Sequence, residues 1–298
     1  MNSRSLFSCC VAEVIGTFLL ILFGCGAVHV AVLTGDLQGL WQVGIVWGIS
    51  IMVAIYVVGP ISGSHINPAI TLGLATWRLF PWSRVAPYIV SQLAGAMIAA
   101  VTLYTLFQPY LVEKEAQKQV VRGGPGSEIT AMCYGEYFPN PGWMAGGDEL
   151  YNSQMHRDYN TRVSESVACL AEVIGTAILG LVVVAVTDPR NVEGPKNLAP
   201  VFIGLTVAAL ICVIAPLTQA CFNPARDFGP RLFAYYAGWG SIALPGPTPT
   251  GFLTVYIISP IAGSVLGIGL YQRVLGPAVA SVTDDTGVTD HSRDLNQP

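Results

Sequence analysis

The fold of this 298-residue chain is decided by two stretches, Ser62-Gly63-Ser64-His65-Ile66-Asn67-Pro68-Ala69 and Thr218-Gln219-Ala220-Cys221-Phe222-Asn223-Pro224-Ala225. Each ends in Asn-Pro-Ala and opens an apolar segment, about residues 67–77 and 223–234, that is too short to cross a bilayer. An Asn N-cap followed by Pro at the first helical position is a strong helix start. Each stretch therefore predicts an extended approach followed by a re-entrant half-helix.

A second motif repeats in the same order: Ala12-Glu13-Val14-Ile15-Gly16-Thr17 recurs as Ala171-Glu172-Val173-Ile174-Gly175-Thr176. This pair is offset by 159 residues and the Asn-Pro-Ala pair by 156, so the two halves of the chain are collinear. Each half carries three long apolar segments and one half-helix. Because three is odd, the second half must enter the membrane from the opposite side, which makes an inverted repeat.

The composition indicates that a bilayer is the main solvent. Hydrophobic residues make up 52% and charged residues only 11% of the chain, whereas soluble domains carry about a quarter charged residues. Six segments are long and apolar enough to span a membrane: about 7–33, 41–59, 86–107, 167–187, 198–216 and 252–274. We expect an all-α membrane protein with one domain over 1–276, repeats at about 7–107 and 166–276, a long loop at 108–165 and a disordered tail at 277–298.

The basic residues near the ends of the spans orient the chain. They gather on the side of both termini, at Arg4, Arg78, Arg84, Arg190, Lys196 and Arg273. The positive-inside rule places that side in the cytoplasm and the long loop outside. We therefore expect a multi-pass protein of the cell membrane, in contact with lipid, whose N- and C-termini are both cytoplasmic.

Several other classes of protein are disfavoured. The net charge of −4 and the lack of a basic stripe indicate no nucleic-acid partner. The seven cysteines form no C-x-x-C pair and the four histidines are scattered, so neither a metal site nor a nucleophile–base pair is apparent. We expect no enzymatic activity, no metal and no cofactor.

The two half-helices predict a selective path through the membrane. Each is about 15 Å long, so two that meet end to end make up the roughly 30 Å core, with both positive dipole ends at the middle. That point repels cations and protons, while Asn67 and Asn223 keep their NH2 donors free for a passing oxygen. A polar track of carbonyls is expected along one wall, from Gly63, Ser64, His65, Gln219, Ala220 and Cys221. With an apolar wall opposite, the path suits an alcohol with a carbon backbone.

These motifs identify a family. The two collinear Asn-Pro-Ala motifs, the stretch Asn223-Pro224-Ala225-Arg226-Asp227-Phe228-Gly229-Pro230-Arg231 and the segment Tyr137-Phe138-Pro139-Asn140-Pro141 resemble the aquaporin family, and more closely its glycerol-facilitator branch. The resemblance covers roughly residues 8–276. It implies an aquaporin-like right-handed bundle, passive passage of glycerol, water and as a further candidate urea, and a homotetramer with one pore in each monomer.

The resemblance also implies a selectivity filter at Trp47, Ile211, Ala220 and Arg226. Bacterial glycerol facilitators usually have a small residue where this chain has Ile211 and an aromatic one where it has Ala220, so the chain departs at both places. The set is closer to the plant nodulin-like subgroup, which also passes glycerol. A water-selective channel remains the alternative: Ile211 and Tyr256 favour it, whereas Asp227, Arg231 and Ala220 oppose it.

Two acids lie inside the predicted spans and allow two interpretations. Glu13 and Glu172 could couple transport to an ion, which would make the chain a secondary transporter. The milder interpretation, which we favour, is that each carboxylate accepts N–H bonds from a re-entrant loop. We expect Gln92 and Asp227 to support the loops similarly, although Gln92 could instead face a neighbouring subunit. The thiol of Cys221 lies beside the filter and could confer block by mercury.

Overall fold

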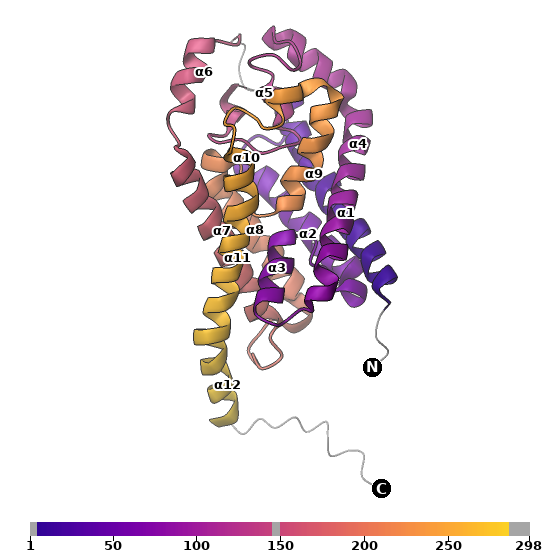
Figure 1. Ribbon diagram of the computed structural model, residues 1–298, viewed down its shortest axis with the longest axis vertical. Coiled ribbons are helices and arrows are strands. Elements are labelled where there is room, and N and C mark those ends of the chain that lie inside the picture. Colours follow the sequence, from indigo (N-terminus) through magenta and orange to yellow (C-terminus); the bar gives the residue numbers. More distant parts are fainter. Residues whose placement is uncertain (1–4, 145–149, 286–298) are drawn as a thin grey trace.

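The computed structural model describes residues 5–144 and 150–285, and helices dominate them (Figure 1). Six helical runs in this part of the chain are long and apolar enough to cross a membrane. The first five are built on α1 (Leu6–Leu33), α2 (Leu40–Ser62), α4 (Val85–Lys118, preceded by η1 at Trp82–Arg84), α7 (Glu165–Thr187) and α8 (Ala199–Thr218, preceded by η3 at Lys196–Leu198). The sixth joins α10 (Gly251–Leu253), η6 (Thr254–Ile258), α11 (Ser259–Leu270), η7 (Tyr271–Leu275) and α12 (Gly276–Asp285). The expected all-α membrane fold is thereby confirmed.

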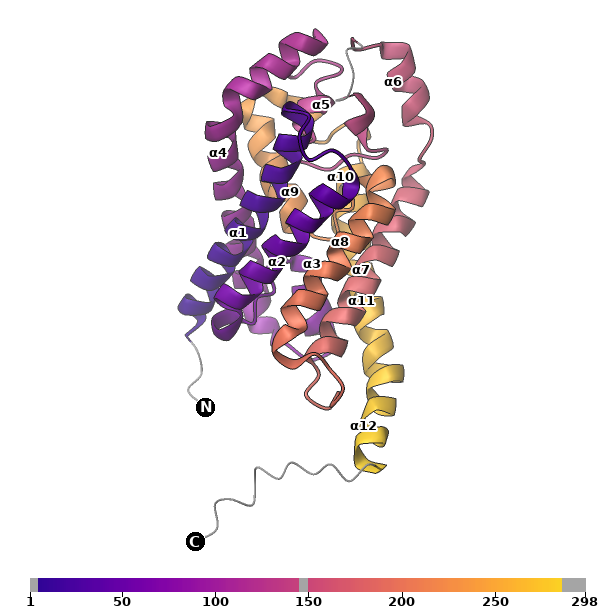
Figure 2. The ribbon, with the colours of Figure 1, turned by 180° about the vertical axis from the view of Figure 1, so that it is seen from behind.

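Two short helices occupy the places predicted for the half-helices. They are α3 (Pro68–Thr76) and α9 (Pro224–Ala234), and they lie toward opposite ends of the bundle (Figure 1). Within each half, α1 packs on α2 and α4, and α7 packs on α8 and α11. Between the halves, α2 packs on α8, as Figure 2 shows, while α3 contacts α11 and α9 contacts α4. Each half-helix is thus held by the other repeat, as an inverted repeat requires.

Glycine allows the spanning helices to approach closely, both between the two halves and within one half. A Cβ on Gly48 of α2 would lie 2.8 Å from the carbonyl oxygen of Gly204 on α8, and one on Gly267 of α11 would lie 1.9 Å from that of Ala177 on α7. No side chain fits at such distances, so a hydrogen is the only substituent that these crossings accept. Small residues serve the same purpose at helix interfaces throughout membrane proteins.

The connection between the halves is shorter than the predicted loop at 108–165. Helix α4 continues through Lys118, because Leu111 is buried against Tyr134 and Trp239 and the chain is tied beyond the helix by an ion pair between Glu115 and Arg122. The boundary at 108 was therefore wrong. The rest of the connection contains α5 (Glu128–Ala131), η2 (Pro141–Met144) and α6 (Ser153–Asn160), and a further non-spanning segment after α9 contains η4 (Tyr235–Trp239) and η5 (Gly240–Ile242).

The predicted start of a disordered tail at 277 was also wrong. Helix α12 extends the last span as far as Asp285, and Pro277 lies within this continuous helical run. Residues 286–298 of the predicted tail lie outside the described residues. The start of α1 and the end of α12 lie at one end of the bundle, and α5 and α6 lie at the other (Figure 1).

Candidate functional site

The two Asn-Pro-Ala motifs begin their half-helices through side-chain caps. The Asn67 Oδ1 accepts a hydrogen bond from the backbone N–H of Ala69 at 2.8 Å. The Asn223 Oδ1 accepts one from Ala225 N–H at 3.0 Å and a longer one from Arg226 N–H. Pro68 and Pro224 are the first helical residues. These caps follow from local sequence alone, because the Asn oxygen satisfies donors that the first turn leaves unpaired.

The amide nitrogens of the same two residues join the repeats across the middle of the molecule. The Nδ2 of Asn67 donates to the Phe222 carbonyl, and the Nδ2 of Asn223 donates to the Ile66 carbonyl, both at 2.8 Å. The expectation that both NH2 donors are free therefore needs correction. Each amide has two N–H groups, so one on each side chain remains for a solute.

Backbone strain marks the approach to each half-helix. Positive φ angles occur at matched positions in the two repeats, at Gly63, Ser64 and Ile66 and at Gln219, Ala220 and Phe222. Residues other than glycine rarely adopt a positive φ angle, because this conformation costs about 1–3 kcal/mol for each residue. In this conformation the N–H groups of each unwound segment and its carbonyl groups point to different sides of the segment.

A buried carboxylate receives the N–H groups of each loop. Glu13 accepts from His65 N–H at 3.0 Å and Ile66 N–H at 2.8 Å, and Ser62 and Gln92 donate to it as well. Gln92 thus contacts the acid within the same chain.

Glu172 repeats this pattern in the second half. It accepts from Cys221 N–H at 3.0 Å, from Phe222 N–H at 2.8 Å and from the hydroxyl of Thr218 at 2.6 Å. Among the residues that the structure describes, no hydrogen bond reaches the carbonyls of Gly63, Ser64, His65, Gln219, Ala220 or Cys221. These six acceptors are therefore unused by the protein.

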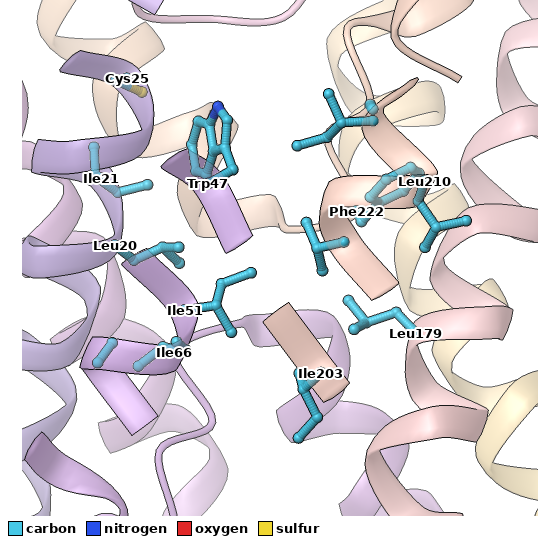
Figure 3. Close-up of a cluster of buried hydrophobic side chains, with 14 of the residues drawn as sticks. Leu20, Ile21, Cys25, Trp47, Ile51, Ile66, Leu179, Ile203, Leu210 and Phe222 are labelled. Atoms are coloured by element: carbon cyan, nitrogen blue, oxygen red, sulfur yellow. The ribbon is translucent and has the colours of Figure 1, made fainter. Parts of the chain in front are cut away.

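One cavity of about 1060 Å³ runs along both loops. Its lining extends from residues 35–39, after α1, to residues 187–190, after α7, and so from one end of the bundle to the other. Residues 63–67 and 219–223 of the two loops line it. Facing them are apolar side chains of α1, α2, α7 and α8, several of which Figure 3 shows pointing toward a common space: Leu20, Trp47, Ile51, Leu179 and Ile203.

The four predicted filter residues, Trp47, Ile211, Ala220 and Arg226, all line this cavity. The Arg226 guanidinium lies 4.7 Å from the centre of the Trp47 ring, a distance at which a cation and an aromatic face attract. The ring has room because residue 24 is glycine: a Cβ there would lie 2.3 Å from the indole. The level of the cavity at these four residues, called the constriction below, therefore combines a flat apolar face with a fork of N–H donors.

Arg226 is also held by a segment of the connection between the halves. Its Nη1 donates to the Tyr134 carbonyl at 2.9 Å, and its Nε forms an ion pair with the Glu136 carboxylate. Glu136 also lines the cavity. The pore wall at this level therefore includes an acid that comes from outside the spans.

Asp227 and Arg231 hold that segment in place. Asp227 accepts from the backbone N–H of Glu136 at 2.7 Å, and Arg231 donates to the carbonyl of the same residue. The two side chains also bind each other, because both carboxylate oxygens of Asp227 accept from Arg231 at 2.8 Å. Asp227 thus contacts the long connection rather than the loop that precedes its own helix.

The sequence as a whole matches the model of the family described as major intrinsic protein, over residues 1–271. The chain belongs to the major intrinsic protein family.

Other major intrinsic proteins are similar to it over nearly their whole length. The glycerol uptake facilitator protein of Haemophilus influenzae is 36% identical over 92% of this chain and 96% of its own length. The glycerol uptake facilitator protein of Pseudomonas aeruginosa is 39% identical over 91% of this chain and 90% of its own length. The propanediol uptake facilitator of Citrobacter freundii is 37% identical over 91% of this chain and 93% of its own length. The X-ray structure of the aquaglyceroporin from Plasmodium falciparum shares the fold, with a TM-score of 0.75 and 24% identity over 92% of this chain and 99% of that one.

Sequence reasoning about this major intrinsic protein missed Glu136. The residue lies in the long connection, which carries no helical period, and only the folded chain brings it to Arg226. One signal was available: Glu136 is the single acid in the aromatic stretch Tyr134-Gly135-Glu136-Tyr137-Phe138 that leads into the quoted Pro139-Asn140-Pro141. A charged residue in such a stretch indicates a buried partner, because an unpaired charge is costly to bury.

Proposed function

We propose that this chain is a passive channel for glycerol and similar small uncharged solutes, with water and urea among them. Its curated relatives are named as facilitators of glycerol and propanediol uptake. The observation that carries the proposal is one cavity that extends from one end of the bundle to the other, with both loops in its wall and apolar side chains of the spans facing them. A polyol fits both walls, because its hydroxyls can donate to the unused carbonyls while its carbon atoms face Trp47, Ile51 and Ile203.

The centre of the path supports exclusion of ions and protons. The N-termini of α3 and α9 face each other across the Asn67 and Asn223 cross-links, so two positive dipole ends lie at one point. A cation that enters meets this potential after losing its water. A water or hydroxyl oxygen that accepts the remaining N–H of each amide cannot also accept from the next molecule in file, which interrupts proton transfer.

Filter geometry favours glycerol over a water-only path. Ala220 contributes only a methyl group to the wall that Arg226 also lines, and the Trp47 ring offers a flat apolar face to a carbon backbone. Ile211 lines the same level and narrows it. The arginine donors orient hydroxyls, whereas the indole replaces the contacts that a carbon chain loses when it leaves water.

Ion-coupled transport has little support. A coupling acid must exchange protons or bind an ion, yet the oxygens of Glu13 and Glu172 already accept four and three hydrogen bonds. These bonds keep the two loops in a conformation that their backbone angles oppose. We assign both acids to loop support.

Membership of this channel family and six apolar spans make the chain a multi-pass membrane protein rather than an enzyme. We further propose that it lies in the cell membrane with both termini in the cytoplasm, on the basis of its basic residues. A homotetramer with four separate pores is proposed from the family resemblance, and each chain holds one complete path.

The test is osmotic. Purified protein in liposomes is exposed to separate glycerol and sucrose gradients, and volume is followed by light scattering. We expect rapid shrinkage in both and rapid re-swelling in glycerol alone, well above the rate of empty liposomes. Fast shrinkage without glycerol entry would instead assign the chain to the water-selective class, with Ile211 as the barrier to mutate.

A further inference from the structure

The arginine of the constriction has a partner that the pore chemistry described above does not use. The side chains of Arg226 and Glu136 are 4% and 1% exposed and form an ion pair. Among the described residues, the two carboxylate oxygens of Glu136 have no hydrogen-bond partner beyond this pair. A buried acid that serves only as a structural tie would be expected to accept further N–H or O–H groups, as Glu13 and Glu172 do.

The other buried acids near Glu136 have hydrogen-bond partners of their own. Asp227 and Arg231 of α9 form a doubly hydrogen-bonded pair, and Glu172 of α7 is bound by loop N–H groups. Tyr137 of the same segment and Tyr256 of the last span complete the titratable surroundings of Arg231, each with its ring against the guanidinium. Of the acids that the structure describes, Glu136 is the one that forms an ion pair with Arg226 at the cavity wall.

We propose that Glu136 sets the net charge of the constriction and thereby keeps small anions out of the pore. This inference rests on the proposed function as a channel for neutral solutes. With Glu136 ionised, the pair at the constriction is neutral, so solutes are selected there by size and hydrogen bonding. Without that negative charge, Arg226 and the two half-helix ends form a continuous positive path from the constriction to the centre of the membrane.

The consequence is specific to the sign of the charge. The positive ends of α3 and α9 repel cations whatever the state of Glu136. Anions are attracted by the same ends, so the obstacles to an anion are the loss of its water and the carboxylate beside Arg226. Removing the carboxylate charge should therefore admit anions selectively and leave cations excluded.

Three planar solutes of similar size and different charge separate these effects: guanidinium, urea and nitrate. Their fluxes are measured in liposomes with the wild-type chain, with Glu136→Gln, and with Glu115→Gln as the matched control. Glu115 is also a largely buried acid paired with an arginine, Arg122, but it does not line the cavity. Glutamine keeps the shape of the side chain and removes its charge.

At about pH 9, where Glu136 is ionised, we expect the wild type and Glu115→Gln to pass urea and to exclude both ions. Glu136→Gln should raise nitrate flux about tenfold or more, leave guanidinium at the rate of empty liposomes, and keep urea within about threefold of the wild type. A purely structural role would instead lower the flux of all solutes together. Nitrate exclusion in a Glu136→Gln channel that still passes urea overturns the proposal, whereas failure of the wild type to pass urea or glycerol overturns the proposed function itself.

If Glu136→Gln does not fold, acid can remove the same charge in the wild type. Burial raises the pKa of Glu136, and the neighbouring Arg226 opposes the rise. As the pH falls from about 9 to about 5, Glu136 should therefore take up a proton and nitrate flux should increase in the wild type and in Glu115→Gln alike. A nitrate flux that stays at the rate of empty liposomes over this range overturns the proposal.

Discussion

Replacing Glu172 by glutamine tests what holds the second loop. The carboxylate accepts three hydrogen bonds, from Thr218 Oγ1 at 2.6 Å, Phe222 N at 2.8 Å and Cys221 N at 3.0 Å. In Glu172→Gln the amide oxygen can still accept two of these donors, but the NH2 group faces the third. One buried backbone N–H is then left without an acceptor, at a cost of about 1–3 kcal/mol.

That cost is comparable with the strain that the loop stores. Gln219, Ala220 and Phe222 each have positive φ, and such residues cost about 1 kcal/mol or more apiece. Loss of one acceptor should let the loop relax, and Ala220 of the constriction and Asn223 of the centre move with it. We expect glycerol and water permeability to fall together, about tenfold or more, with a midpoint of thermal unfolding several degrees lower.

The assay is light scattering of liposomes, with thermal unfolding in detergent as the second readout. Glu165→Gln is the matched control, because Glu165 lies on the same helix and accepts bonds from Thr250 and Thr254 instead of the loop. It should leave permeability unchanged. Wild-type permeability and stability in Glu172→Gln would refute the role in loop support, and loss of gradient-driven accumulation with downhill flux retained would indicate ion coupling.

Three further predictions use other contacts. Gly24→Ala should displace the Trp47 ring, since the added Cβ would lie 2.3 Å from it, and should change the ratio of glycerol to water permeability; an unchanged ratio would mean that the ring does not form the wall. Mercuric ion should block flux by binding the thiol of Cys221, which lines the cavity, and Cys221→Ser should remain open; block of both proteins would place the reactive thiol elsewhere. At the end of α7, hydrogen bonds from Arg190 lower the pKa of Asp188 from 3.8 to about 2. Because the folded pKa lies below the unfolded one, this contribution to stability is present above about pH 4 and is lost as the pH falls toward 2. The difference in thermal midpoint between the wild type and Asp188→Asn should therefore be constant from pH 7 to about pH 4 and close below it, and a difference that closes between pH 7 and pH 5 would contradict this reasoning.

Local patterns in the sequence determined the elements and their order. Length and hydrophobicity located the six spans, because a bilayer requires every backbone group of a spanning segment to be paired within a helix. Asn before Pro located the starts of α3 and α9, since that cap depends on neighbouring residues alone. The two repeated motifs, together with an odd number of spans in each half, determined the inverted topology. The ends of α4 and α12 could not be found in this way, because both helices continue past the apolar segment.

Tertiary structure decided how the two halves meet. The hydrogen bonds from Asn67 to Phe222 and from Asn223 to Ile66 join residues more than 150 positions apart. The residues that neighbour each Asn in the sequence do not indicate that one of its amide N–H groups binds the other repeat. Glu136 reaches Arg226 for the same reason: Asp227 and Arg231 bind the backbone of the connection and bring its acid to the constriction. The hydrophobicity of a segment depends on its own residues, so the sequence alone is enough to locate the spans. The charge of the constriction depends on which buried groups are paired, and only the folded chain determines that pairing.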